Sequence, residues 1–78
     1  MLKNEFYELD PLTSIVVSYE EIPPLDPYND VAYQATVRYI TTRKCLTVKS
    51  VQTLSVTRVK QIAWAIVAEM RVEYQQRN

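Results

Sequence analysis

The hydrophobic pattern of this chain changes its period once, near Leu54, and that change limits the folds open to it. Before Leu54, apolar and polar residues alternate, which is typical of strands that are buried on one face. After Leu54, apolar residues recur every three or four positions, as on one face of a helix. The 78 residues leave room for one small domain. We therefore expect a β-sheet followed by a single helix.

Alternation is clearest in the middle of the chain and weaker on either side. The expected strands span residues 12–22, 31–42 and 45–52. In the middle strand the face expected to be buried carries Val31, Tyr33, Ala35, Val37 and Tyr39. The leading segment around Phe6, Tyr7 and Leu9 predicts a short edge strand that ends at Pro11. Prolines between residues 23 and 30 predict a stiff surface loop, because proline fixes φ and lacks a donor.

The last third of the chain predicts a helix over about residues 55–75. Ser55 is the expected N-cap, because its hydroxyl can accept from a free backbone N–H of the first turn. Seven apolar side chains share the face expected to be buried: Val56, Val59, Ala63, Ile66, Val67, Met70 and Tyr74. The predicted fold class is α+β, a single domain over residues 1–78. Three or four antiparallel strands pack in two layers against one long C-terminal helix (βββα).

The residue types that are missing exclude most enzyme chemistry. With no His, the chain lacks the usual general base and the commonest metal ligand. Without Gly it has neither a P-loop nor a dinucleotide-binding fingerprint. Cys45 is the single cysteine, which fits a reducing, cytoplasmic setting. We therefore expect a protein that is not an enzyme, with no cofactor and no metal site.

No segment predicts membrane contact. The longest apolar run, Ile62–Ala68, has seven residues, whereas a span needs about 20. No apolar segment typical of a signal peptide follows the first charged residues.

A second apolar stripe lies on the helix outside the face expected to be buried. Trp64, Ala68 and Val72 recur every four residues, with Ala65 beside them. One sheet cannot cover both sides of a helix, so this stripe predicts a protein interface, either with another protein or with a second copy in a homodimer. The alternative is that the chain covers Trp64 itself. The covering residues would be Phe6, Tyr7 and Leu9 of the leading segment, or Leu25 and Tyr28 of the loop.

Charge is polarised along the chain although the formal net charge is zero. Residues 1–30 hold one Lys against seven acids, and residues 31–78 hold eight Lys and Arg against two acids. An acidic surface is expected at Glu20, Glu21, Asp26 and Asp30, available to a basic partner surface. The alternative is internal compensation, with Glu20 facing Arg38 or Lys49 across paired strands.

The basic residues give an alternative function, duplex nucleic-acid binding through Arg43, Lys44, Arg58 and Lys60. The last two are expected in the first turns of the helix, where the helix dipole favours anions such as phosphate. Residues 31–75, with a helix opening on Thr57, Arg58, Val59 and Lys60, resemble the C-terminal half of a double-stranded RNA-binding domain. That resemblance implies phosphate contacts for Arg58 and Lys60, while residues 1–24 offer no counterpart of the family's first helix.

The leading hypothesis is a non-catalytic protein-binding module that acts by occupying a partner's surface. Small size, absent catalytic residues and split charge resemble small accessory proteins of phages and mobile elements that act as inhibitors of a host protein. No membrane and no small-molecule partner is expected.

Overall fold

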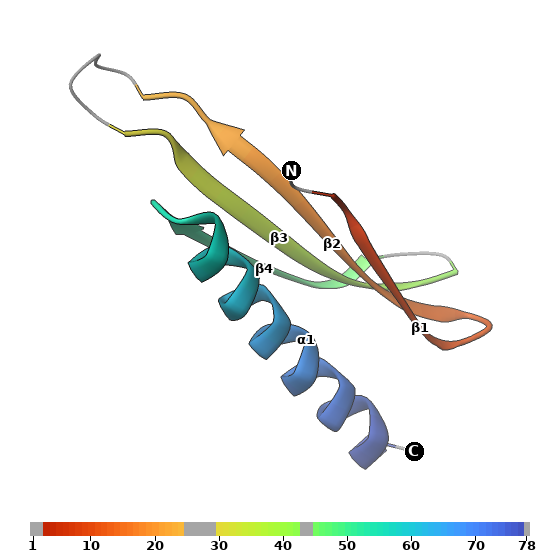
Figure 1. Cartoon of the computed structure of the whole chain (residues 1–78). Helices are drawn as coiled ribbons and strands as arrows, with labels where there is room; N and C mark the ends of the chain where they lie inside the picture. Colours follow the sequence, from red (N-terminus) through yellow and green to blue (C-terminus); the bar gives the residue numbers. More distant parts are fainter. Residues whose placement is uncertain (1–2, 25–29, 43–44, 78) are drawn as a thin grey trace.

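In the computed structural model, which describes residues 3–24, 30–42 and 45–77, four strands precede one helix. The elements are β1 (Glu5–Asp10), β2 (Thr13–Ile22), β3 (Ala32–Thr41), β4 (Cys45–Thr53) and α1 (Val56–Arg77). The strands form one antiparallel sheet in the order β1-β2-β3-β4, and the helix lies across one face (Figure 1). The predicted α+β fold is confirmed, with the edge strand present as β1.

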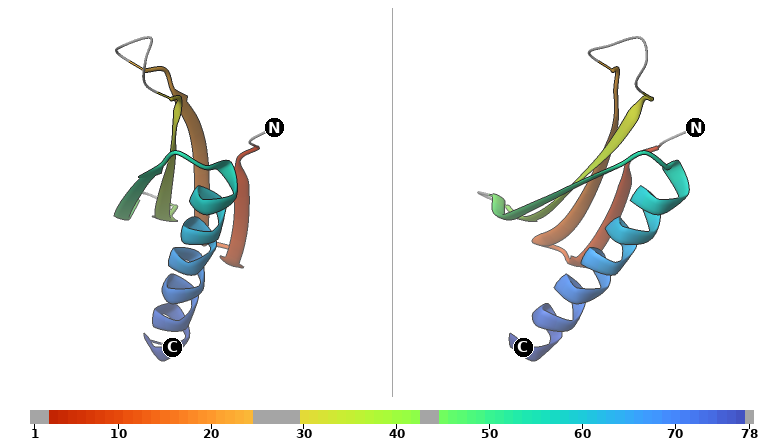
Figure 2. Two further views of the ribbon diagram at one scale, coloured as in Figure 1. Left: turned by 60° about the vertical axis from the view of Figure 1, so that its left-hand side comes forward. Right: turned by 90° about the vertical axis from the view of Figure 1, so that its left-hand side faces the viewer.

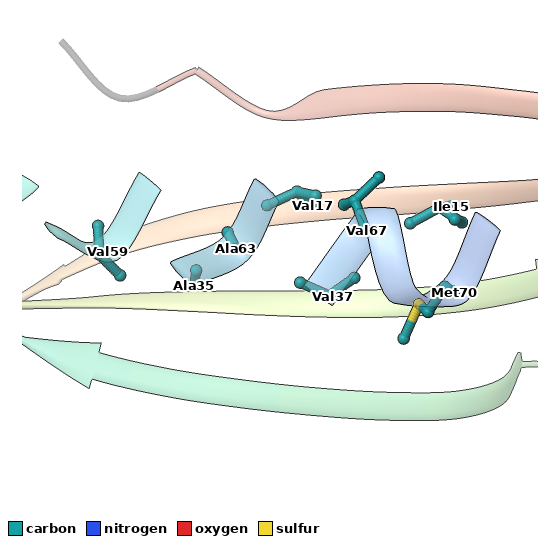
Figure 3. Packing of buried hydrophobic residues seen from close by; sticks show 8 residues of the cluster. All are labelled: Ile15, Val17, Ala35, Val37, Val59, Ala63, Val67 and Met70. Atoms are coloured by element: carbon teal, nitrogen blue, oxygen red, sulfur yellow. The ribbon is translucent and has the colours of Figure 1, made fainter. Parts of the chain in front are cut away.

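The two faces of the sheet follow the alternation of the sequence. Ile15 and Val17 of β2 and Ala35 and Val37 of β3 are fully buried beneath the helix. Figure 3 shows them meeting the helix side chains that recur at helical spacing: Val59, Ala63, Val67 and Met70. Burying such side chains stabilises the fold by about 1.5–3 kcal/mol each for the larger ones, and these contacts hold helix and sheet together.

Register aligns the face that packs on the helix across neighbouring strands. Val17 of β2 pairs with Val37 of β3, and Ala35 pairs with Val51 of β4. A one-residue slip would turn every buried side chain to solvent, so burial fixes the register. Shifts in register occur near the β1–β2 and β3–β4 turns, between Glu8 and Asp10 and between Tyr39 and Ile40.

The start of the helix is capped as the sequence predicts. The Arg58 backbone N–H donates to the Ser55 hydroxyl at 3.3 Å, and the Val59 N–H donates to the Ser55 carbonyl at 3.0 Å. At 1.5 Å per residue the 22 residues of α1 extend about 33 Å. The helix thus runs the length of β1 and leaves one long side uncovered (Figure 2).

Candidate functional site

The uncovered side of α1 holds the second apolar stripe, here called the helix surface (Trp64, Ala65, Ala68 and Val72). All four side chains are exposed, and the larger two are 48% and 52% exposed at Trp64 and Val72. A shallow hollow lined by Ala68, Glu69, Val72 and Glu73 continues this surface toward the C-terminus. The apolar core of the sheet packs against the opposite side of the helix, and these four residues remain exposed.

Trp64 is anchored to the leading strand by a carboxylate. Its indole N–H donates to both oxygens of Glu5, at 2.9 Å to Oε1 and 3.0 Å to Oε2. The hydroxyls of Tyr7 and Tyr19 donate to the same carboxylate, at 2.7 and 3.2 Å. Glu5 thus joins β1, β2 and α1 at one point. The indole ring is fixed at its edge while about half of its surface stays in solvent.

The alternative, in which the chain itself covers Trp64, is only partly seen: the side chain is 48% exposed. The leading segment does reach the indole through Glu5, while Tyr7 and Leu9 pack against the core cluster. Phe6 is 69% exposed and pairs with Val16 on the opposite face of the sheet. Leu25 and Tyr28, the other expected cover, lie outside the described residues.

Two tyrosine pKa values reflect this junction. Burial first, and then the hydrogen bond to Glu5, raise the pKa of Tyr7 to about 12. Burial and the charge of Glu5 also raise the pKa of Tyr19. Both hydroxyls therefore remain protonated donors to the carboxylate at neutral pH.

A second anchor between α1 and β1 lies at Asp10, the last residue of β1. The Tyr74 hydroxyl donates to the Asp10 carboxylate, and this bond lowers the pKa of Asp10 and raises that of Tyr74. Trp64 and Tyr74 are ten residues apart, about 15 Å on a helix, and Glu5 and Asp10 are five apart, about 17 Å on a strand. The near-equal spans let both bonds form when α1 runs alongside β1.

The predicted acidic surface lies at the projecting end of the β2–β3 hairpin. Glu20, Glu21 and Asp30 are all exposed, and Asp26 lies outside the described residues. The expected compensation within the chain is wrong in its register, because Glu20 is opposite Gln34 rather than Arg38 or Lys49. Lys49 instead approaches Glu69 of the helix, 3.9 Å between Nζ and Oε2. The reason is that burial of Val17 and Val37 sets the alignment of β2 and β3, and attraction between charged side chains does not shift it.

The basic residues of the alternative interface do not converge within the described part of the chain. Arg58 and Lys60 are two positions apart on a helix, which turns their side chains roughly 200° from one another. Both follow the C-terminal end of β4, whereas Arg43 and Lys44 lie outside the described residues and precede its first residue, Cys45. The resemblance to the RNA-binding domain is confined to residues 31–75, since the preceding segment forms the strands β1 and β2.

Little else in the described ranges suggests chemistry. Cys45 is exposed at the start of β4, and its thiol lies 3.6 Å from the Thr47 carbonyl. Residues 3–24, 30–42 and 45–77 hold no group of three or more potential metal ligands. Over those same ranges, no helix combines the length and the apolar character that crossing a bilayer requires.

Sequence reasoning missed the Glu5 junction. The contact joins residues 59 positions apart, and no local pattern reports such a pairing. One signal was present: period-two alternation puts Glu5 on the same face as Tyr7 and Leu9, which marks it as an acid on a face otherwise turned toward the helix.

Comparison with protein-family models, with curated proteins and with solved structures finds no significant match to this chain.

Proposed function

We propose that this protein is a non-catalytic protein-binding module whose helix surface occupies the surface of another protein. The observation that supports it most is a half-exposed tryptophan, Trp64, flanked by Ala65 and Ala68 on a helix anchored at two points. Tryptophan is strongly enriched among the few residues that dominate binding energies. Small neighbours let a partner backbone approach the indole closely.

The anchoring of Trp64 favours binding over mere exposure. A free side chain loses rotamer entropy when a partner immobilises it, at a cost of about 0.5–1.5 kcal/mol. The bond from the indole to Glu5 already restricts the ring, so most of this rotamer entropy is lost when the protein folds and not when a partner binds. The apolar faces of the ring remain available, since only its N–H edge is occupied.

The acidic end of the β2–β3 hairpin extends the proposed contact. Glu20, Glu21 and Asp30 are exposed and form no ion pair within the part of the chain that is described. We infer a cytoplasmic partner with a basic surface beside an apolar groove, and the module would act as an inhibitor by covering that surface. The single free thiol, Cys45, supports the reducing compartment.

The experiment is quantitative capture of partners from a lysate of the native host, followed by affinity measurement on the protein captured. Immobilised wild type is compared with Trp64→Ala and Ala68→Glu, and with Leu12→Glu as the matched control at the exposed turn between β1 and β2. We expect the two helix variants to weaken binding at least about thirtyfold, the effect of losing a dominant contact of about 2 kcal/mol. The control should bind like wild type.

Two outcomes count against the proposal. Equal capture by wild type, Trp64→Ala and Ala68→Glu would remove the helix surface from any interface. Retarded mobility of labelled duplex at about 50 mM salt, abolished when Arg58 and Lys60 are changed to Glu, would identify a nucleic-acid binder instead, because phosphate contacts depend steeply on salt.

A further inference from the structure

The face of the sheet turned away from α1, here called the outer face, has no element over it in the described part of the chain (Figure 2). One row crosses all four strands, formed by Phe6, Val16, Arg38 and Val48 in register. Val48 is 55% exposed. Such a face, with apolar side chains at its margins, differs from the purely polar face that a solvated sheet normally presents.

On β2 and β3 the charges of the outer face are separated along the strands, whereas Glu8 of β1 adds an acid one row beyond Arg38. Glu20 lies in the row of Gln34, and Arg38 lies four residues further along β3, roughly 13 Å away along the strand. Neither forms an ion pair in the described structure, and the guanidinium of Arg38 donates to the Ser18 hydroxyl at 3.3 Å. The sequence extends this polarity, since residues 18–37 contain no Lys or Arg and residues 31–68 contain no acid.

A row of small polar side chains lies midway between the charges. Ser18, Thr36 and Ser50 are in register across β2, β3 and β4, one row from Glu20 and one row from Arg38. Consider a second copy that faces the outer face and is related to the first by a two-fold axis running across the strands, along this row. Arg38 of one copy then lies at the same height along the strands as Glu20 of the other copy, displaced by one strand. The same contact forms twice by symmetry, and the assembly closes as a dimer.

We propose that two copies of this chain pair through their outer faces, with strands running antiparallel about the Ser18–Thr36–Ser50 row. Sheets packed face to face lie about 10 Å apart, a gap that long Arg and Glu side chains bridge. Rotation about an axis parallel to the strands is disfavoured, because it places Glu20 beside Glu20 and Arg38 beside Arg38. The arrangement covers Val48 and leaves the helix surface free, so it does not depend on the proposed function.

The dimer is expected to be weak. From strand spacing and rise, each outer face offers roughly 500–600 Å², compared with about 800 Å² per partner in a standard stable interface. Mass should therefore be measured by sedimentation equilibrium from about 10 μM to about 1 mM, at about 50 and 500 mM NaCl, because screening weakens the charge pairs. We expect a concentration-dependent dimer that dissociates more readily at high salt.

Charge reversal gives the decisive test. Arg38→Glu alone and Glu20→Arg alone should each weaken the dimer about tenfold, since each turns two attractive contacts into repulsive ones. An equimolar mixture of the two variants should restore it as a heterodimer, in which every cross-contact joins opposite charges. Restoration by mixing cannot come from a repaired monomer fold. Ala68→Glu on the helix surface is the matched control, because Ala68 is exposed, and it should leave the mass unchanged.

Several results would overturn the proposal. Wild type that stays monomeric over the whole concentration range removes the dimer, and single variants whose mixture stays monomeric remove the antiparallel arrangement. A dimer lost with Ala68→Glu and kept with Arg38→Glu places the contact on the helix instead. If circular dichroism shows either charge variant unfolded, Val48→Asp, at an exposed position, serves as the second test: an unchanged mass for this variant refutes the outer-face contact.

Discussion

The Glu5 carboxylate makes the most exact stability test that the structure allows. It accepts hydrogen bonds from Tyr7, Tyr19 and Trp64, so Glu5→Ala leaves three donors without their partner. The two phenol groups are part-buried, and an unsatisfied donor of this kind costs about 1 kcal/mol. The indole is half-exposed, and water can replace the carboxylate there. The expected loss of unfolding free energy is about 2 kcal/mol.

The assay is thermal and urea unfolding, followed by far-ultraviolet circular dichroism and by fluorescence of Trp64, the single tryptophan. For a domain of this size, 2 kcal/mol corresponds to a fall in Tm of roughly 8–16 °C. Glu8→Ala is the matched control, because Glu8 lies on the same strand, is exposed and has no partner in the described structure. Its effect should stay within about 0.5 kcal/mol. If Glu5→Ala proves as stable as Glu8→Ala, the carboxylate is not the junction described above.

Three further predictions concern the core, the helix cap and alkaline pH. Val37→Ala removes two methyl groups from a fully buried position and should cost about 2 kcal/mol in unfolding experiments, whereas Val48→Ala at an exposed position should cost under about 0.5. Ser55→Ala removes the cap of α1 and should cost about 1 kcal/mol by the same measurement; an unchanged urea midpoint would show that the hydroxyl contributes nothing. Because the pKa of Tyr7 is raised from 10.0 to about 12, the folded state holds its proton more tightly than the unfolded state. Stability should therefore be level from neutral pH to just below pH 10 and fall as pH rises toward 12, less steeply in Tyr7→Phe; a flat urea midpoint over this range would contradict the burial of Tyr7 and its bond to Glu5.

Local pattern was enough to predict the elements and their faces. Alternation placed Ile15, Val17 and Val37 on one side of the sheet, and helical spacing placed Val59 and Ala63 opposite them. These predictions hold because side-chain direction follows directly from strand and helix geometry, which neighbouring residues establish. The same spacing predicted which helix residues the sheet would leave exposed.

Tertiary structure decided which distant residues meet. The charge of Glu20 suggested a cationic neighbour, yet burial of the apolar face set the register and placed Gln34 opposite it. Likewise Glu5 meets Trp64 only because α1 packs alongside β1, a position fixed by contacts with β2 and β3. Hydrophobic burial is the larger free-energy term, so it selects the alignment, and charged and hydrogen-bonding groups then pair with whatever that alignment brings near them.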